Sequence, residues 1–458
     1  MGILNKIAQF RELKSGVKHC TFNPGGPGVV RIHLIPPKFK LFNNSSYVVI
    51  LNGYYLIPLG YSWAIMLSRF IEQVNQYDGR EISESDYDSI IDSTLENTLK
   101  VYPFISKKEI SEDLSYMLDA IFAVAKGEGT DAEIDRMSIR SYAKSMYAPH
   151  RMDLMVSAMT DCDGRWKCNQ KCLFCYAGGE KLSGAKELST EQWKLAIDRL
   201  KKAGVPMLTF TGGEPTQRED LCELIDYSRW FVTRLNTNGT LLTEELCSSL
   251  CDASLDSLQI TLYSHNEEVH NSLVGAPCFD KTVTGIKNAV NAGLDVSINT
   301  PLCKKNADYI ETLRFIRSLG VRFVTISGLI CTGMAENKHG EYDLSSDELY
   351  EIVKSAKQFC NENGMEIDFT SPGLINNDRL EEINMNAPMC GACLSNMAIA
   401  PDGSVIPCQS WLSEDGCLGN ILTDSFKQIW ENTSCKRLRD MSDEEAKCCP
   451  FRKRGKNG

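Results

Sequence analysis

Three cysteines lie within eight residues of one another in the stretch CNQKCLFCY, which runs from Cys168 to Tyr176. Thiolates are the standard protein ligands of iron-sulfur clusters, and a cubic four-iron cluster has four iron corners. Three thiolates from one short loop can bind three irons and leave the fourth without a protein ligand. An open iron can bind a small molecule, so the spacing of Cys168, Cys172 and Cys175 predicts a cluster that takes part in chemistry.

The three cysteines alone also allow two other interpretations. A structural zinc ion prefers four protein ligands, usually on paired CxxC elements, and a chain with 19 cysteines can contain a close triple by chance. A second motif, LTFTGGEPT, favours the iron-sulfur interpretation. Its Gly212 and Gly213 end a predicted strand and would let bare backbone approach a ligand. Glu214, the next residue, offers an acceptor for an ammonium group.

These motifs, in this order, resemble the radical S-adenosylmethionine (SAM) superfamily, and the resemblance extends over residues 150 to 335. It implies a [4Fe-4S] cluster on Cys168, Cys172 and Cys175, with SAM chelated at the open iron. It also implies an electron donor such as flavodoxin or ferredoxin. One electron from the cluster would cleave SAM, and the resulting 5′-deoxyadenosyl radical would abstract hydrogen from a substrate.

The resemblance further implies which residues contact SAM. At one position the chain departs from the commonest pattern, because Val274 stands where many members have an arginine. His265 and His270 are predicted to be loop and packing residues, since radical hydrogen abstraction needs no general base, and no catalytic residue is assigned. The implied SAM contacts are Phe174, Tyr176, Gly212, Gly213, Glu214, Asn236, Thr237, Asn238, Thr261, Ser264 and Asn299.

A second group of cysteines lies near the end of the chain, in CGACLSNMAIAPDGSVIPC. Its spacing resembles the SPASM extension of radical SAM enzymes, which carries auxiliary iron-sulfur clusters. We expect one auxiliary [4Fe-4S] cluster, because Gly455 stands where a full extension continues with further cysteines. Zinc stays an alternative at this site. Cys417 and Cys435 are predicted to be structural or loop thiols. Cys417 is also an alternative cluster ligand. The implied ligands are Cys390, Cys393, Cys408, and either Cys448 or Cys449 as the fourth.

The elements that must position these motifs are predicted by alternating β-branched runs and amphipathic segments, which are typical of βα units. Six units fall short of the eight that close a barrel, so we expect an α/β fold with an open, partial (β/α)6 TIM-like barrel. Its chemistry would lie at the carboxyl ends of the strands. The predicted strands are residues 152–159, 207–211, 231–237, 257–263, 295–300 and 322–327, and helices are predicted at 219–230, 243–254, 280–293, 309–320 and 345–364.

The chain before this barrel has a different pattern, with predicted strands near 29–35 and 47–51 followed by helical segments. Its size and element order resemble the PqqD-like domain, a winged helix-turn-helix that binds a leader peptide as an added edge strand. The predicted domains are residues 1–150 (α+β, PqqD-like), 151–335 (radical SAM core), 336–385 (connecting helix and strand) and 386–458 (SPASM-like cysteine-rich extension).

Composition limits the partners and the compartment. A net charge of -11 argues against nucleic-acid binding. No basic segment followed by an apolar one opens the sequence, so we expect a cytoplasmic protein with reduced thiols. The uncharged stretch 41–67 is interrupted by Asn, Gly and Pro residues, and we therefore predict no membrane span.

Three functions remain open from the sequence. The leading hypothesis is a maturase for a ribosomally synthesised peptide, which forms a thioether or another side-chain crosslink on a peptide or protein substrate. A second is a small-molecule radical SAM enzyme of cofactor biosynthesis. A third, from another class, is a non-catalytic metal-binding interaction protein.

Overall fold

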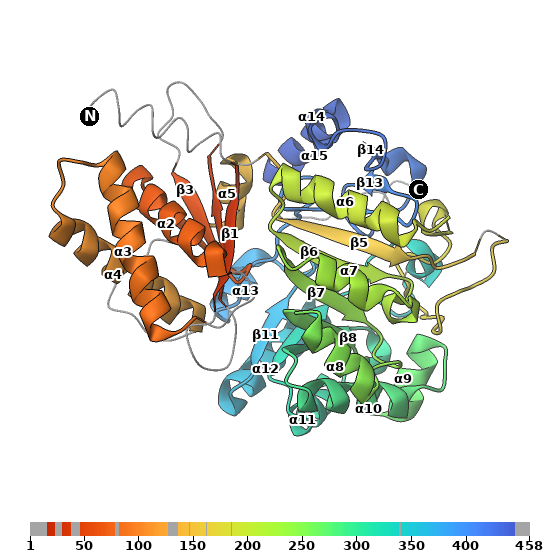
Figure 1. Ribbon diagram of the computed structural model, residues 1–458. Helices are drawn as coiled ribbons and strands as arrows, with labels where there is room; N and C mark the ends of the chain where they lie inside the picture. Colours follow the sequence, from red (N-terminus) through yellow and green to blue (C-terminus); the bar gives the residue numbers. More distant parts are fainter. Residues whose placement is uncertain are drawn as a thin grey trace. The chain divides into compact units, whose positions relative to one another are not determined.

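The computed structural model describes residues 16–22, 30–37, 46–77, 82–126, 136–145, 147–161, 163–184, 186–338 and 340–444. Cys448 and Cys449 lie outside these residues. The chain forms two compact units (Figure 1). The first comprises residues 1–150 with 201–206, and the second comprises 151–200 with 207–458.

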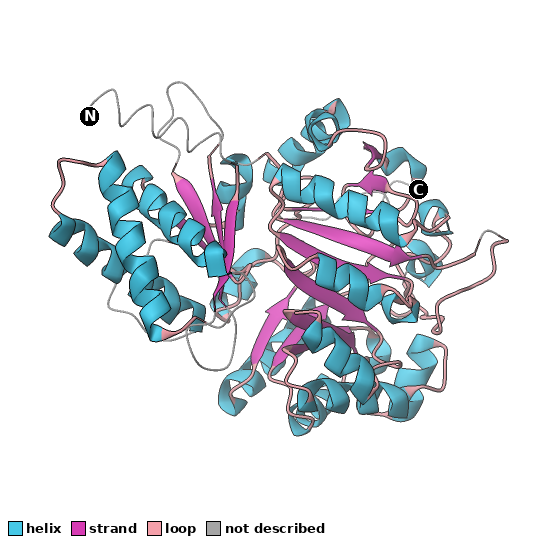
Figure 2. Ribbon diagram, viewed as in Figure 1, coloured by secondary structure: helices cyan, strands magenta, loops and turns pink. Residues whose placement is uncertain are grey.

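The first unit is a four-stranded antiparallel sheet, in the order β1-β2-β3-β4, packed against helices (Figure 2). Ile32, Val49, Phe70, Leu95 and Leu118 belong to one buried core that joins sheet and helices. Two strands of this sheet, β1 and β4, were not predicted from the sequence patterns. The elements are β1 (Lys18–Phe22), β2 (Val30–Ile35), β3 (Tyr47–Leu51), β4 (Tyr55–Leu59), α2 (Tyr61–Val74), α3 (Glu84–Val101), α4 (Lys107–Lys126) and α5 (Ile139–Ser145).

The second unit is built on a ten-stranded sheet in the order β11-β10-β9-β8-β7-β6-β5-β12-β13-β14. Strands β5 to β11 are parallel and follow one another in chain order, which confirms the partial barrel. The strands are β5 (Arg151–Ser157), β6 (Met207–Gly212), β7 (Val232–Thr237), β8 (Ser257–Thr261), β9 (Val296–Pro301), β10 (Phe323–Ser327), β11 (Glu366–Phe369), β12 (Asn396–Ile399), β13 (Ser404–Ile406) and β14 (Gly419–Asn420).

Helices between the parallel strands cover the outer face of this sheet (Figures 1 and 2). Gly293, Gly320 and Gly364 have positive φ angles where α10, α11 and α12 end, which is common for the glycine that follows a helix. The helices of this unit are α6 (Thr190–Ala203), α7 (Leu221–Tyr227), α8 (Glu244–Asp252), α9 (Glu267–Val274), α10 (Phe279–Asn291), α11 (Tyr309–Ser318), α12 (Ser346–Asn363), α13 (Asn377–Glu382), α14 (Phe426–Glu431) and α15 (Thr433–Glu444).

Polar and apolar residues alternate along the middle strands of the barrel. On β8, Leu258 and Ile260 are fully buried, whereas Gln259 is only partly buried. Successive strand residues point to opposite faces of a sheet, so the apolar set packs under the helices and the polar set lines the concave face. Gln259 Nε2 donates to Thr325 Oγ1 (3.1 Å), which in turn donates to Asn299 Oδ1 (3.1 Å). These bonds connect β8, β9 and β10 on the concave side.

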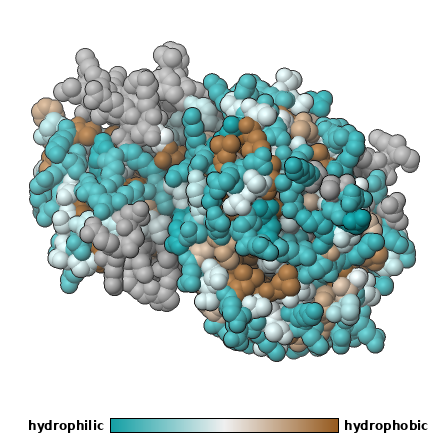
Figure 3. All heavy atoms as spheres, turned by 45° about the vertical axis from the view of Figure 1, so that its right-hand side comes forward, coloured by the Kyte–Doolittle hydropathy of each residue, from teal (hydrophilic) through white to brown (hydrophobic). Residues whose placement is uncertain are grey.

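The outer surface is mixed in polarity. On the face in Figure 3, hydrophilic side chains predominate and hydrophobic ones gather in small patches. Within the described residues, no helix is both long and apolar enough to span a bilayer. The uncharged stretch near residue 50 instead forms β3, β4 and the start of α2.

Candidate functional site

The three-cysteine loop follows β5 and is fixed by the end of α9. The backbone N–H of Lys171 donates to the Val274 carbonyl (2.9 Å), and that of Leu173 donates to the Leu273 carbonyl (2.8 Å). Gly275 ends α9 with φ of 66°, and a Cβ there would lie 2.5 Å from the Lys171 carbonyl oxygen. This close approach of α9 to the loop therefore requires glycine.

The three thiols lie near one another in a mostly buried environment. Burial raises the pKa of the Cys168 thiol to about 12, and it also raises the pKa of Cys172 and of Cys175. The neighbouring thiols raise the pKa of Cys172 further, because thiolates repel one another. Cation binding would reverse this, since a metal-bound thiol is deprotonated. Metal binding would therefore stabilise the three clustered thiols as thiolates.

The number of thiols on the loop bears on which metal group it suits. A structural zinc ion takes four protein ligands around one centre, and the loop supplies three thiols. A cubic cluster takes one thiolate at each of several irons. The three thiols can therefore hold three irons of such a cluster.

The end of β6 approaches β5 closely at the two predicted glycines. A Cβ on Gly212 would lie 2.4 Å from the Ser157 carbonyl oxygen, and one on Gly213 would lie 2.6 Å from the Ala158 carbonyl oxygen. The Gly213 carbonyl oxygen accepts a hydrogen bond from Cys168 Sγ at 3.4 Å. The structure thus brings the glycine motif and the cysteine loop together, as the sequence predicted for two parts of one site.

Glu214 joins the ends of β6 and β7. Its side chain is 2% exposed. Oε1 accepts hydrogen bonds from the Thr216 N–H (3.0 Å) and from the hydroxyls of Thr216 and Thr237 (both 2.5 Å), and Oε2 accepts one from the Asn238 N–H (2.8 Å). Burial nevertheless raises the pKa of this carboxyl. The carboxylate therefore holds the site together, and its contact with the SAM ammonium stays a prediction.

The end of β7 carries two asparagines in different environments. Asn238 Nδ2 donates to Asn169 Oδ1 (2.7 Å), which connects β7 to the residue after Cys168. Among the residues that the structure describes, Asn236 Oδ1 is buried and accepts no hydrogen bond. A buried acceptor without a donor is costly, so this atom is a point where a bound ligand could donate.

The remaining predicted SAM contacts lie at the carboxyl ends of strands or on the cysteine loop. Thr261 ends β8, and Asn299 lies near the end of β9. Ser264 Oγ accepts from the Asn266 N–H (3.1 Å) and so shapes the start of α9. Phe174 is buried and makes an edge contact with Tyr342, with ring centroids 5.4 Å apart. Their contacts with SAM stay predictions.

The two histidines near α9 are packed or tethered. His270 is fully buried and its Nδ1 accepts from the Tyr263 N–H (3.3 Å). Burial lowers its pKa to about 4. His265 Nδ1 lies 3.2 Å from Thr312 Oγ1. His270 is thus a buried residue of α9, and His265 lies against α11.

Tyr176 connects the cysteine loop to the C-terminal cysteines. Its hydroxyl lies 3.4 Å from Gln409 Oε1, and it lies near the Cys408 thiol. Gln409 was not singled out by the sequence patterns, because nothing in its spacing relates it to Tyr176. The structure thus brings the two predicted metal sites into one region of the second unit.

The C-terminal cysteines lie on a turn before β12, after β13 and on α15. Cys393 is fully buried and lies near Cys408, while Cys390 Sγ is 3.9 Å from Ser442 Oγ. Cys435, predicted as a structural or loop thiol, is fully buried and accepts a hydrogen bond from Arg439 Nη2 (3.3 Å). Sequence spacing alone could not indicate this contact. The predicted fourth ligands, Cys448 and Cys449, lie outside the described residues.

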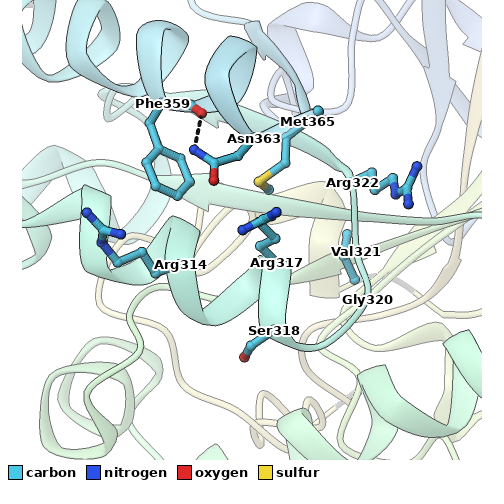
Figure 4. A pocket seen from close by; sticks show the side chains of 10 residues that line it. Arg314, Arg317, Ser318, Gly320, Val321, Arg322, Phe359, Asn363 and Met365 are labelled. Carbon is cyan, nitrogen blue, oxygen red and sulfur yellow. Dashed lines mark hydrogen bonds between the residues drawn. The ribbon is translucent and has the colours of Figure 1, made fainter.

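A surface cavity of about 590 Å³ lies at the opposite end of the strands from this site (Figure 4). Its lining includes Arg317 at the end of α11, Phe359 and Asn363 at the end of α12, and Arg322 and Met365 just before β10 and β11. In partial barrels the chemistry lies at the carboxyl ends of strands. This cavity is therefore separate from the candidate site.

Comparison with known proteins gives the class of the two cysteine-containing regions. The Radical SAM superfamily model matches residues 167–316, and the SPASM model, an iron-sulfur cluster-binding domain, matches residues 390–450. Residues 167–316 are therefore a radical SAM domain, and residues 390–450 are a SPASM domain. A radical SAM domain implies SAM and a [4Fe-4S] cluster, and a SPASM domain implies auxiliary iron-sulfur clusters. The clustered thiols and the buried Asn236 acceptor fit these groups.

Individual relatives have different substrates. AdoMet-dependent heme synthase of Methanosarcina barkeri is 28% identical, over 62% of this chain and 86% of that protein. Mycofactocin maturase MftC of Mycolicibacterium smegmatis is 27% identical, over 59% of this chain and 69% of that protein. The crystal structure of Streptococcus suis SuiB bound to precursor peptide SuiA is similar in fold, with a TM-score of 0.58 and 16% identity, over 86% of this chain and 88% of that one.

Proposed function

We propose that this protein is a peptide maturase, which uses radical SAM chemistry to crosslink or otherwise modify side chains of a ribosomally synthesised precursor. When bound, the cluster and SAM supply reductive cleavage of SAM and abstraction of a hydrogen atom from the substrate. The chain's own residues hold the thiols on one loop, join that loop to β6 and β7 through Glu214 and Asn238, and line the concave face where a substrate would lie.

The observation that carries this proposal is the extent of the likeness to SuiB. Residues 151–458 make up about two thirds of the chain, yet the likeness covers 86% of it. It must therefore extend into the first unit. The radical SAM and SPASM domains alone would not require that. A peptide-modifying neighbour with a comparable first unit supports a role for this unit in binding a precursor, as the PqqD-like resemblance predicts.

The first unit offers an edge strand for such a peptide. Its sheet ends at β1 on one side and at β4 on the other. On β4, the Leu56 carbonyl already accepts from the Met137 N–H (2.8 Å), and Pro58 lacks an N–H altogether. Peptides that add to a sheet need backbone donors and acceptors along the edge. On β1 one carbonyl, that of His19, accepts from Asn75 Nδ2 (2.8 Å), but each of its five residues has an N–H. We therefore expect a leader peptide to pair with β1.

The concave face of the barrel also favours a peptide. The side chains of Arg234, Asn236, Gln259 and Asn299 alternate there with buried apolar residues. Amides and hydroxyls on this face can pair with peptide groups, which carry one donor and one acceptor per residue. A polar wall of this kind suits a peptide better than it suits a large apolar ring system.

The test uses the purified protein under anaerobic, reducing conditions, together with each short open reading frame that neighbours its gene. We expect 5′-deoxyadenosine from SAM, and a mass change in one encoded peptide that depends on Cys168, Cys172 and Cys175. Removal of residues 1–150 should abolish peptide binding, while peptide-independent SAM cleavage persists and shows that the second unit is folded. A truncated protein that modifies the same peptide equally well would contradict the proposed role of the first unit.

The second candidate is a small-molecule enzyme, favoured by the match to AdoMet-dependent heme synthase over 62% of this chain. That match is compatible with a role for the second unit alone. Turnover of an iron porphyrin precursor, unchanged by removal of residues 1–150, would favour this candidate. No 5′-deoxyadenosine under any reducing condition would contradict both candidates.

A further inference from the structure

The concave face of the barrel carries a row of charged and polar side chains near the amino ends of strands β5 to β8 (Figure 1). The strand pairing puts Asp153 beside Thr209, and Thr209 beside Arg234. Arg234 in turn lies beside Ser257. Neighbouring strands are about 5 Å apart, and residues in register point to the same face of a sheet. These four side chains therefore form one continuous row, which we call the polar row.

Arg234 lies on the polar row without a carboxylate partner. Its Nε donates to Ser257 Oγ (3.3 Å), and within the described residues its guanidinium belongs to no ion pair. Burial lowers the pKa of the Arg234 guanidinium, and the positive charge of Arg151 lowers it further. A guanidinium held away from water without an opposite charge is costly. A ligand that brings a negative charge would therefore bind favourably beside Arg234.

The carboxylates nearest to Arg234 leave its charge in excess. Asp153 is 1% exposed, and its Oδ1 lies 2.9 Å from Nε of Arg151, with which it forms an ion pair. Asp295 and Asp368 raise the pKa of Arg234, but both residues are exposed, so water and salt screen them. The group of Arg151, Asp153 and Arg234 therefore has an excess of one positive charge.

The hydroxyl of Thr209 is a second group on the polar row that lacks a partner. Thr209 is 2% exposed, and in the part of the chain that the structure describes its Oγ1 makes no hydrogen bond. A buried hydroxyl without a partner is costly. Because Thr209 and Arg234 are in register on neighbouring strands, one ligand group can accept from both side chains.

The charge of the polar row indicates which anion it would bind. A carboxylate carries one negative charge and would leave the group neutral, whereas a phosphate monoester carries about 1.5–2 at pH 7 and would leave a buried negative charge. The two oxygens of a carboxylate match the planar fork of a guanidinium. They also have lone pairs left to accept from a hydroxyl. A carboxylate therefore fits better than a phosphate.

We propose that Arg234 and Thr209 bind a carboxylate of the substrate, with Arg234 donating to both oxygens and Thr209 donating to one of them. The inference rests on the proposed function, because it takes the substrate to be a peptide, whose carboxylate is an Asp or Glu side chain or the C-terminus. Arg234 lies three residues before the end of β7 at Thr237, which is about 10 Å along the strand. A substrate held at Arg234 would extend from there toward the cysteine loop.

The test uses the anaerobically purified full chain with its clusters and saturating SAM, and three probes of nearly the same shape. N-acetyl-glutamate α-amide carries only the side-chain carboxylate, N-acetyl-glutamine carries only the α-carboxylate, and N-acetyl-glutamine amide is neutral. Isothermal titration calorimetry measures the affinity for each probe and, separately, for SAM. Because the test needs no turnover, its failure is distinct from a failure to modify a peptide.

The variants separate the two proposed contacts from a general effect of charge. They are Arg234→Gln, Arg234→Lys, Thr209→Val and, as a matched control, Arg317→Gln, which removes an exposed guanidinium from the cavity in Figure 4. Arg234→Lys keeps the charge and loses the planar fork. Thr209→Val keeps the shape and removes the unpaired hydroxyl, so it should be at least as stable as the wild type. Circular dichroism checks that each variant is folded.

We expect the wild type to bind one of the carboxylate probes about tenfold more tightly than the neutral probe, as hydrogen bonds to a charged group imply. Whether this is the α-amide or the glutamine probe identifies the source of the carboxylate. Arg234→Gln should abolish the preference, Arg234→Lys and Thr209→Val should each reduce it, and Arg317→Gln should leave it unchanged. The affinity for SAM should be the same in all variants. If Arg234→Gln does not fold, the lysine and valine variants decide.

Three results would overturn the proposal. Equal affinity of the wild type for the charged and neutral probes would show that the polar row holds no carboxylate. Loss of the preference in Arg317→Gln but not in Arg234→Gln would move the carboxylate site to the cavity at the other end of the strands. Weaker SAM binding in Arg234→Gln, with unchanged probe binding, would assign Arg234 to SAM instead. Formation of 5′-deoxyadenosine and a mass change in a peptide would still test the proposed function independently.

Discussion

The buried carboxylate of Glu214 gives the sharpest test of how this site is held together. Substituting Glu214→Ala removes the acceptor of four hydrogen bonds. The hydroxyls can rotate toward other acceptors, but the backbone N–H groups of Thr216 and Asn238 cannot. Each stranded buried donor costs about 1–3 kcal/mol, so two of them imply a loss of about 2–6 kcal/mol in the free energy of unfolding.

This loss should appear in anaerobic urea unfolding followed by circular dichroism. The matched control is Glu191→Ala, because the Glu191 side chain is 82% exposed and pairs with Lys194 on its own helix. The control should change the free energy of unfolding by no more than about 0.5 kcal/mol. Asn238 also connects to Asn169 beside Cys168, so Glu214→Ala should weaken SAM binding too. A destabilisation below about 1 kcal/mol would refute the interpretation of Glu214 as the joint between β6 and β7.

Two further predictions concern α9. Burial lowers the pKa of His270 to about 4, whereas an unfolded histidine titrates near 6.5. Between these two pH values the unfolded state binds a proton that the folded state does not. About 3 kcal/mol of the free energy of unfolding should therefore be lost as the pH falls from 6.5 to 4. The difference in unfolding free energy between wild type and His270→Asn should be constant above pH 7 and shrink over that interval, and a difference independent of pH would contradict the burial argument. Gly275→Ala should destabilise the protein by about 1–3 kcal/mol more than Gly293→Ala, because both glycines have positive φ but only Gly275 would place a Cβ against the cysteine loop. Iron retention and thermal unfolding of the two variants measure this difference. Equal effects would mean that the loop moves freely.

Much of the barrel could be predicted from sequence because its strands and helices are local patterns. All six predicted strands occur, each within a few residues of its expected bounds. The seventh parallel strand, β11, was predicted only as part of a connecting segment, because four residues carry too little periodicity. In the first unit, β1 and β4 were not predicted. β4 contains Pro58, which argues against a strand until its place at the sheet edge is known.

The candidate site was predictable to the extent that its chemistry lies in adjacent residues. The cysteine loop and the glycine motif can be recognised from the spacing of their residues. In the structure Cys168 Sγ lies 3.4 Å from the Gly213 carbonyl oxygen. The contacts of Gln409 and Cys435 were not predictable, because they depend on how β13 and α15 pack. Glu214 was expected to serve a ligand, but its hydrogen bonds within the protein show a second task that no sequence pattern indicates.

The alternation along β8 and β9 bears on what this enzyme can bind. Strands of a closed barrel are buried on both faces and read as nearly continuous apolar runs, whereas here every second residue is polar. Polar side chains on the inner face are stable where they hydrogen-bond with one another, as Gln259, Thr325 and Asn299 do, or where water or a ligand reaches them. An open barrel meets that condition, because its missing strands leave the concave face accessible. These polar residues would destabilise a closed barrel. In the open barrel they offer hydrogen-bonding groups to a substrate on the concave face, near the carboxyl ends of the strands.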